Sequence, residues 1–493
     1  MKDINILLIH ADQHRKDCLG AYGNTEIITP HIDALAGDGV KYEDSYCVFP
    51  ICTPSRYSML SGMYAHQHLS VTNRSTLPEG VPTFVKELRK SGFHTAAVGK
   101  MHFTPTYLDV GFDTMCLAEQ DGEGRYDDDY HRHLMENQLA DVFDWWDECP
   151  QYRKNAPQSY WESYNATVSE LPCEEHSTSW IGKEALKEID TWESGGNMLM
   201  VGFIKPHFPF DPPKPWSDLY DPEKLTLLPG WTEYTLPMDR AVNPGRFDFA
   251  EMTESKMRQI QAYYYANISH VDSEVGKIIS LLKQKGLYDK TMIIYTSDHG
   301  DYMGYHHMVG KKNHFYDPVI KIPLIIKYPY QTQHGVVNTA VNSNIDLAPT
   351  ILRQVALPVP PTMKGQDLNG DYKSNKFVVC QLVCDEADGF MIRTKKYKLM
   401  LYKQKEYNAF FDLERDPYEL KNVISQPDYA EIVEKMTKQL MDFVLFDFPA
   451  TALVDLGAKQ CQEENVPKDI PANRERIREY YEKKMADQEI QER

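Results

Sequence analysis

The sequence predicts an α/β protein in which a mixed, mostly parallel sheet lies between layers of helices, followed by a smaller C-terminal α+β domain with an antiparallel sheet. Three observations indicate this class. Short, continuous apolar runs alternate with helical patterns along most of the chain. Neither an internal repeat nor a low-complexity tract interrupts the alternation. Beyond a proline-rich joint at residues 357–361, the alternation gives way to a series of short strand-like segments.

The elements of the larger part follow from apolar periodicity. Continuous apolar runs predict five buried strands, at residues 4–10, 93–98, 198–204, 292–296 and 323–328. The clearest helix precedes the fourth strand, and Gly286 stands where this helix would end. Its spacing predicts a crossover helix with one buried stripe. The stripe consists of residues three or four positions apart: Met257, Ile260, Tyr264, Ile268, Val271, Val275, Ile278 and Leu282.

Two segments depart from this alternation. Residues 119–178 combine an acidic cluster at residues 127–129 with aromatic residues and histidines in no clear period. We interpret them as a long insertion over one end of the sheet. Residues 206–215 contain five prolines, which excludes a regular helix or a central strand there.

The C-terminal part has a different pattern. A helix is predicted near residues 429–446, and a highly charged tail follows it. We therefore expect two domains, one at residues 1–370 and a smaller one at residues 371–493. The antiparallel strands of the second domain are predicted at residues 377–382, 389–393, 397–402 and 409–413.

Composition excludes several classes of protein. The 493 residues include 53 Lys and Arg and 72 Asp and Glu, a formal net charge of −19. Sequence-independent binding to nucleic acid or to an anionic membrane needs a basic face, so this charge argues against both partners. Nine cysteines are too few for a disulfide scaffold, and the odd number leaves at least one unpaired. Neither a signal-peptide pattern nor a membrane-spanning apolar run is present, so we expect a cytoplasmic protein, or a periplasmic or secreted one if a leader was removed.

Polar side chains follow four of the predicted strands. Ligands of parallel sheets bind at the carboxyl ends of the strands, so these side chains are expected to meet. Each one alone has an ordinary explanation as a turn former, a helix cap or a surface group. Their coincidence at one edge favours a functional site, with Lys205 the member that we assign a structural role. The residues are Asp12, Gln13, Lys100, His102, Lys205, His207, Asp298 and His299.

The residue types at this edge suit a metal ion. Asp12, Gln13 and Asp298 offer the hard oxygen ligands that Ca²⁺ or Mg²⁺ prefers. A zinc site would need more imidazole or thiolate ligands and is the weaker alternative.

The sharpest local feature is the segment Cys52-Thr53-Pro54-Ser55-Arg56. Pro54 at a first helical position would place Cys52 at a helix N-terminus, where unpaired N–H groups favour an anion or a thiolate. Arg56, one turn further, can reach the same anion with its guanidinium group. The residues alone leave three roles open for Cys52: a nucleophile, the precursor of a modified residue, or a buried thiol.

This segment resembles the signature of the type I, formylglycine-dependent sulfatases of the alkaline phosphatase superfamily, Cys-x-Pro-Ser-Arg-x-x-x-Leu-Thr-Gly. Residues 52–62 match it, with Ser61 in place of Thr. The resemblance covers nearly the whole chain and implies the fold of that superfamily. Further matches to its motifs lie at residues 12–13, 99–102, 205–210, 296–300, 346–352 and 412–419.

The resemblance implies a mechanism. A formylglycine-generating maturation enzyme would oxidise Cys52 to an aldehyde, whose hydrate presents two hydroxyl groups. One hydroxyl would attack the sulfur of a sulfate monoester and displace the alcohol, and the second would then release sulfate and regenerate the aldehyde. Ca²⁺, with Mg²⁺ as the alternative, would be held by Asp12, Gln13, Asp298, His299 and the modified Cys52.

The resemblance also implies roles for the remaining residues. Arg56 and Lys100 would bind the diol and the sulfate oxygens, His102 would accept a proton from the second hydroxyl, and His207 would protonate the leaving oxygen. The family pattern places one more lysine four residues before a Tyr and eleven before a Pro. Lys312 has this relation to Tyr316 and Pro323, so we expect Lys312 rather than Lys311 at the site.

Other functions compete with a sulfatase that acts on a sugar or aryl sulfate. A phosphonate monoester or phosphodiester hydrolase of the same superfamily is the main alternative. A non-catalytic sulfoglycan-binding protein is the alternative from another class, but every expected catalytic position is filled.

Several questions stay open at the level of sequence. The tyrosines and tryptophans of residues 126–163 either stack on a substrate or form the core of the insertion. The roles of His306, His307 and His314, the fate of the charged tail, and the oligomeric state are undecided.

Overall fold

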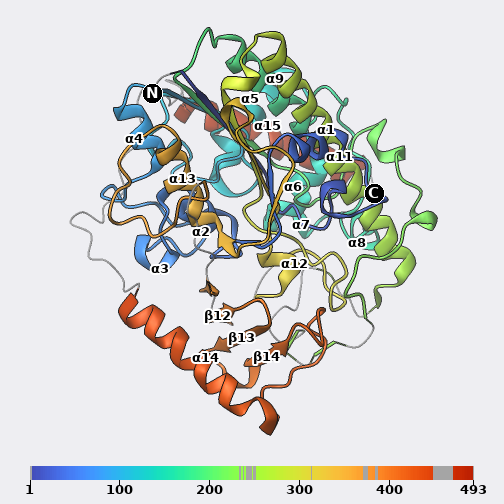
Figure 1. Ribbon diagram of the computed structural model, residues 1–493. Coiled ribbons are helices and arrows are strands. Elements are labelled where there is room, and N and C mark those ends of the chain that lie inside the picture. Colours follow the sequence, from blue (N-terminus) through green and yellow to red (C-terminus); the bar gives the residue numbers. More distant parts are fainter. Residues whose placement is uncertain are drawn as a thin grey trace.

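The computed structural model describes residues 3–232, 235–236, 238–239, 247, 251–311, 314–369, 376–383, 387–447 and 470–491. A mixed, mostly parallel sheet of eight strands forms the centre of the larger part (Figure 1). Pairing is parallel except where β8 meets β7 and β2. The strands, from one edge to the other, are β5 (Thr114–Leu117), β4 (His94–Gly99), β6 (Asn197–Phe203), β1 (Asn5–Ala11), β7 (Thr291–Thr296), β8 (Leu324–Lys327), β2 (Val40–Tyr42) and β9 (Val336–Asn338).

Alternation along the central strand β1 places side chains on both faces of the sheet. Leu7 and Ile9 face a layer made of α1 (Pro30–Gly37), α9 (Ser177–Asp190) and α11 (Glu254–Gln284). Ile6 and Leu8 face the opposite layer. That layer consists of α2 (Cys52–Ser61), α4 (Phe84–Lys90) and α13 (Leu347–Gln354).

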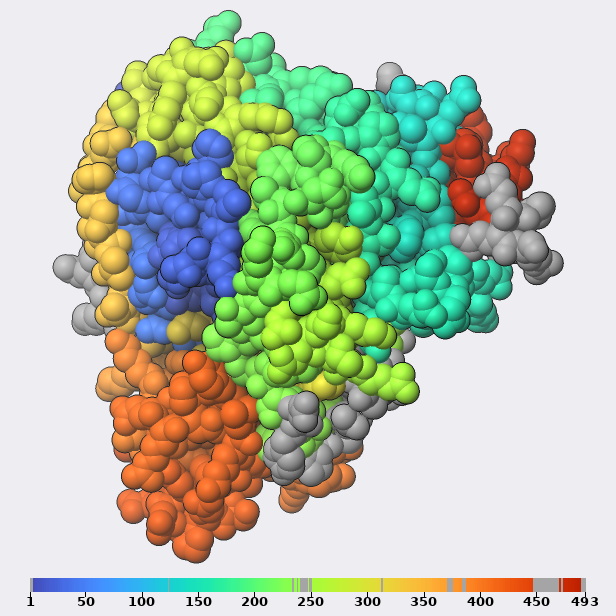
Figure 2. All heavy atoms as spheres, turned by 90° about the vertical axis from the view of Figure 1, so that its right-hand side faces the viewer, coloured from blue at the N-terminus to red at the C-terminus, as the bar shows by residue number. Residues whose placement is uncertain are grey.

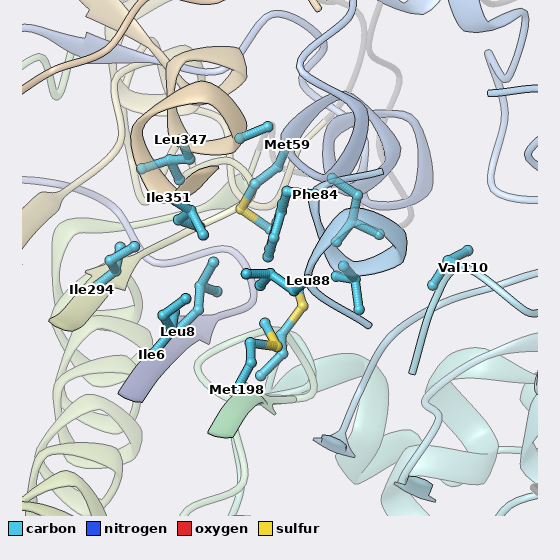
Figure 3. Packing of buried hydrophobic residues seen from close by; sticks show 14 of the residues in the cluster. Ile6, Leu8, Met59, Phe84, Leu88, Val110, Met198, Ile294, Leu347 and Ile351 are labelled. Carbon is cyan, nitrogen blue, oxygen red and sulfur yellow. The ribbon is translucent and has the colours of Figure 1, made fainter. Parts of the chain in front are cut away.

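The second layer fixes the helix that carries Cys52. Met59 of α2 is buried among Phe84 of α4 and Leu347 and Ile351 of α13, above Leu8 of β1 (Figure 3). Burial of a side chain of this size contributes about 1.5–3 kcal/mol, so these contacts hold α2 against the sheet.

The expected crossover helix is confirmed as α11. Thr253 caps its N-terminus by accepting a hydrogen bond from the Lys256 backbone N–H, at 3.3 Å. Gly286 follows its last turn with a φ of +67°, a conformation that suits glycine. All five predicted strands exist, and the sheet gains three strands that periodicity did not indicate: β2, β5 and β9.

Residues 119–178 form short helices that share their core with neighbouring elements. Trp145 and Tyr160 are buried in one cluster with Met257 of α11, and Tyr130 is buried in the layer that contains α9. These rings do not face solvent as a sugar platform would. The helices are η2 (Gly122–Tyr126), α5 (Asp129–Glu136), α6 (Val142–Glu148), α7 (Pro150–Arg153) and α8 (Gln158–Glu162).

The C-terminal part contains the predicted antiparallel sheet, with α14 (Ala430–Asp442) beside it (Figure 1). The boundary at residue 370 falls outside the described residues and stays a prediction. Arg393 and Lys398 connect this sheet to the larger part through Asp317, at 2.9 and 2.5 Å. The strands are β11 (Val378–Leu382), β12 (Gly389–Arg393), β13 (Tyr397–Tyr402) and β14 (Ala409–Asp412).

The charged tail ends in a docked helix, α15 (Ile470–Gln491). This helix returns to the insertion and lies away from the C-terminal sheet in two perpendicular views (Figures 1 and 2). Tyr481 packs on Trp145 with ring centroids 4.3 Å apart, and Arg474 pairs with Asp127 at 2.5 Å.

The remaining elements are short. They connect the layers or flank the main sheet: β3 (Ser45–Tyr46), β10 (Asn342–Ser343), α3 (Ala65–His68) and α12 (Asp317–Ile320). None of the described helices has the length and apolar character needed to cross a membrane.

Candidate active site

The predicted residues meet at the carboxyl edge of the central strands. Asp12 and Gln13 follow β1, Asp298 and His299 follow β7, and Cys52 is the first residue of α2. Lys100 and His102 follow β4, and His207 follows β6. All of these side chains are buried: Asp12, Gln13, Cys52, Lys100, His102, His207, Asp298 and His299.

Local sequence explains the position of Cys52. Ile51 precedes α2 in an extended conformation, and Ser55 N donates to Ile51 O at 3.0 Å, which closes the first turn. Pro54 is the third helical residue rather than the first, so the expected position of the proline was wrong, although Cys52 does stand at the helix N-terminus. Ser55 Oγ donates to the Asp298 carbonyl at 2.6 Å and ties this turn to the end of β7.

Four side chains offer ligand atoms that lie within 4.8 Å of one another: Asp12, Cys52, Asp298 and His299. Gln13 adds a fifth candidate. Its Nε2 donates to Asp301, while its Oε1 is buried and has no hydrogen-bond partner among the described residues. An orphaned buried oxygen costs free energy unless something binds it, so this donor set fits a hard cation.

The backbone of Gln13 is fixed in an unusual conformation. Its φ is +64°, and its carbonyl accepts a hydrogen bond from the Tyr264 hydroxyl at 2.6 Å. Its N–H donates to Asp298 Oδ1 at 3.2 Å. Asp301 is held by the backbone N–H groups of Met303 and Gly310, at 2.6 and 3.1 Å. The side-chain amide of Gln13 therefore has one orientation.

Arg56 joins the two site carboxylates. Its Nε donates to Asp298 Oδ2 at 2.9 Å, and its Nη2 donates to Asp12 Oδ2 at 2.8 Å. Lys100 Nζ lies 2.7 Å from the same Asp12 oxygen. Burial and the neighbouring Cys52 raise the pKa of Asp12, but Lys100 and Lys311 outweigh them and hold that pKa well below its usual range. Asp12 is therefore a carboxylate in the folded protein.

Cations surround the Cys52 sulfur. Lys311 Nζ lies 2.7 Å from Sγ, and His299 Nε2 lies 3.3 Å from it. Burial would raise the pKa of the thiol, but Lys311, Lys100 and His299 lower it well below its ordinary value. The same positive field would attract an anion at this position.

The sequence predicted that Lys312 would be the lysine at this position, but Lys312 lies outside the described residues. Lys311 was the expected solvated neighbour, yet it is only 8% exposed and contacts the site. Its Nζ is also 3.1 Å from His299 Nε2.

The two catalytic candidates among the histidines have opposite surroundings. His102 Nε2 lies 2.7 Å from Asp121 Oδ1. Burial lowers the pKa of His102, but Asp121 outweighs it and raises that pKa to about 10. His207 Nδ1 donates to the Phe208 carbonyl at 2.6 Å. Burial, Lys311 and Lys100 lower the pKa of His207 to about 4.

Lys205 has a structural role, as expected. Its Nζ contacts Asp211 at 2.5 Å and donates to the Pro209 carbonyl at 2.9 Å. His306 and His314 cluster around Asp239 near the C-terminal sheet, and the ring of His307 packs against Trp231 at a tilt of 36°.

The sequence did not predict three side chains that contact Lys100 and His102. Gln120 accepts from Lys100 Nζ at 2.8 Å, Glu119 accepts from the His102 backbone N–H at 3.0 Å, and Asp121 contacts the His102 ring. They follow β5 after one residue, Ala118, and the parallel pairing of this four-residue strand with β4 brings the two strand ends together. Recognition of β5 would have indicated them.

Comparison with known proteins agrees with this geometry. The family model described as Sulfatase matches residues 4–356. The chain belongs to the sulfatase family. A second model, N-sulphoglucosamine sulphohydrolase, C-terminal, matches residues 304–444 of this sulfatase, across the junction with the antiparallel sheet.

Relatives of the sulfatase span nearly its full length. An arylsulfatase of Clostridium perfringens is 28% identical over 89% of this chain and 93% of its own. An N-acetylglucosamine-6-O-sulfatase of Bacteroides thetaiotaomicron is 25% identical over 89% of this chain and 85% of its own. A phosphonate monoester hydrolase from Silicibacter pomeroyi has a similar structure, with a TM-score of 0.72, 26% identity, and coverage of 89% of this chain and 94% of the other.

These likenesses confirm the alkaline-phosphatase-like fold and the enzyme class. The sulfatase hydrolyses sulfate esters. Its family generally depends on formylglycine and on a bound metal ion, and the buried group of Asp12, Cys52, Asp298 and His299 is compatible with both.

Proposed function

We propose that the sulfatase uses Cys52, oxidised to formylglycine by a maturation enzyme, as the nucleophile toward a sulfated sugar or an aryl sulfate. The observation that carries this proposal is the position of Cys52. It is buried at the first position of α2, within reach of three candidate ligands, Asp12, Asp298 and His299, and of the cations Lys100 and Lys311. A structural thiol requires none of these groups. A nucleophile that attacks an anionic ester requires cations to bind the anion and ligands to hold a metal ion.

We assign the metal site to Asp12, Gln13, Asp298 and His299, together with the oxygen of the modified residue 52. Oxygen atoms dominate this set, so Ca²⁺ is the preferred ion and Mg²⁺ the alternative. Such an ion would lower the pKa of the hydrated aldehyde and neutralise charge on sulfate oxygens.

The remaining side chains form two groups, one for binding the substrate and one for proton transfer. Arg56 and Lys100 would hold residue 52 and the sulfate group, together with Lys311, whose Nζ lies 2.7 Å from Cys52 Sγ. His102 is the proton acceptor for the step that releases sulfate, and its raised pKa means that the ring must lose a proton before that step. His207 is the proton donor to the departing alcohol. The pKa of His207 is low in the free enzyme, so the negative charge of the bound substrate must raise it before the ring can take a proton from water and donate it.

The names of relatives support a small sulfated substrate. An arylsulfatase and an N-acetylglucosamine-6-O-sulfatase are each similar over most of this chain. A sulfated monosaccharide and an aryl sulfate are therefore the first substrates to assay.

A phosphonate monoester hydrolase is the second candidate, because a protein with that name has a similar structure at 26% identity. The matured enzyme should be assayed side by side on p-nitrophenyl sulfate and on a phenyl phosphonate ester. We expect the higher kcat/KM on the sulfate. A clear preference for the phosphonate would replace the proposed function with the alternative one.

A further inference from the structure

The turn after β5 contacts two site residues through three consecutive side chains. Glu119 accepts hydrogen bonds from the backbone N–H groups of Met101 and His102, at 3.1 and 3.0 Å. Gln120 accepts from Lys100 Nζ at 2.8 Å. Asp121 contacts the ring of His102 at 2.7 Å. The segment that follows β4 is therefore held residue by residue by the segment that follows β5.

The backbone of His102 needs this support. Its φ is +57°, a left-handed conformation that is strained for a residue other than glycine. The Glu119 carboxylate receives the His102 N–H with both oxygens, at 3.0 and 3.1 Å. The backbone that carries the ring is therefore fixed. What is still variable is the tautomer, that is, which ring nitrogen carries the proton.

We propose that Asp121 is a positioning residue that fixes the tautomer of His102, so that Nδ1 is the basic nitrogen facing residue 52. A carboxylate near neutral pH only accepts hydrogen bonds, so Asp121 Oδ1 requires a proton on Nε2. No described residue hydrogen-bonds to the buried Nδ1. The ring interacts with Cys52, and Nδ1 is the nitrogen left for that contact.

This inference rests on the proposed function for its place in the reaction. In the release step, Nδ1 takes the proton of the free hydroxyl on residue 52. The electrons of that O–H bond form the carbonyl, and the bond from the same carbon to the sulfated oxygen breaks. Sulfate leaves with that electron pair, and the charge that His102 gains is stabilised by Asp121.

Asp121 is well suited to a substitution test. Its side chain is 34% exposed, so a change there leaves no buried cavity. Asp113, at the other end of the same strands, offers a matched control because it is 35% exposed and also lies beside a histidine, His94, at 3.9 Å. We expect Asp121→Ala and Asp121→Asn to lower kcat on p-nitrophenyl sulfate by about 100-fold. A burst of p-nitrophenol should precede the slow steady state, and Asp113→Asn should behave like the wild type.

Two readouts separate positioning from a general structural role. First, the double variant Asp121→Ala with His102→Ala should be no slower than His102→Ala alone, because Asp121 acts only through that ring. Second, ¹⁵N spectra of histidine-labelled protein, recorded across a pH titration that passes the raised pKa of His102, should show the neutral ring protonated at Nε2 in the wild type, with this preference lost in Asp121→Ala. The His102→Ala spectrum identifies the resonance, and this measurement does not require the formylglycine.

The outcomes are distinct. Wild-type kcat in both Asp121 variants, additive losses in the double variant, or an unchanged tautomer would each overturn the inference. A matured wild-type enzyme without activity on any sulfate ester would instead overturn the proposed function, and the tautomer measurement would still test Asp121.

Discussion

At the scale of single residues, charge decides what the site can do. Arg56, Lys100 and Lys311 face the carboxylates of Asp12 and Asp298, so a divalent cation bound there would give the site a formal charge of about +3. Strand ends in the sequence indicated most of these residues because parallel strands deliver their last side chains to one edge. The site lysine was harder to predict, because Lys311 lies outside the regular helices and strands and no periodic pattern indicates its position.

The adjacent lysines can be separated by substitution. We expect Lys311→Met to lower kcat by about 100-fold, because it removes a cation 2.7 Å from Cys52 Sγ. Lys312→Met is the matched control and should retain most activity, as measured by kcat/KM on p-nitrophenyl sulfate. The reverse result would restore the assignment that sequence spacing favours.

In the proposed metal site, Gln13 is a neutral ligand where a carboxylate would add negative charge. We expect Gln13→Glu to bring a second carboxylate against Asp301 and so to lower the melting temperature of the metal-free protein. The same change should increase the gain in melting temperature on addition of Ca²⁺, because the site becomes more negative. Thermal unfolding with and without Ca²⁺ measures both effects.

The exposed Gln151 provides the control for this change. Gln151→Glu should leave the Ca²⁺-dependent shift unchanged. An unchanged shift in Gln13→Glu would show that Gln13 does not face the metal.

At the scale of elements, length determined what the sequence could predict. The 31-residue helix α11 and the continuous strand runs carry many periodic residues, so they were predicted closely. The strands β2 and β9 have three residues each and β5 has four, too few for a period to be recognised. The docking of α15 was undecided because its sequence is charged on most sides, and the contact uses only a few apolar residues.

The contact between α15 and the insertion predicts a loss of stability. Tyr481 is fully buried against Trp145, so Tyr481→Ala should lower the free energy of unfolding by about 3 kcal/mol. Tyr480 is only partly buried, and Tyr480→Ala should cost about 1 kcal/mol. Urea unfolding followed by tryptophan fluorescence measures both. Equal costs for the two variants would contradict the docking.

At the scale of the whole molecule, a net charge of −19 surrounds a cationic site. Composition therefore argued against nucleic acid and anionic membranes as sequence-independent partners but could not reveal the local electrostatic field at the site. The electrostatic field at the site depends on a few cations that the fold brings together, and these cations lie far apart in the sequence.

The surrounding negative charge predicts a salt effect. We expect kcat/KM for p-nitrophenyl sulfate to rise by less than about 10-fold between ~10 and ~150 mM salt, as the Debye length falls from about 30 to about 8 Å. Salt screens the repulsion between the acidic surface and the anion while the buried pocket is screened less. A steep fall in kcat/KM over this range would contradict the account and indicate a cationic approach to the site.

The most direct test of the central claim is mass analysis of the tryptic peptide of residues 42–56, from fully active protein made with a maturation enzyme. This peptide contains both Cys47 and Cys52, so Cys47 serves as an internal control for thiol alkylation. The account predicts an alkylated Cys47 and an aldehyde in place of the thiol at residue 52, with activity lost in Cys52→Ala. An unmodified thiol at residue 52 in fully active protein would contradict it.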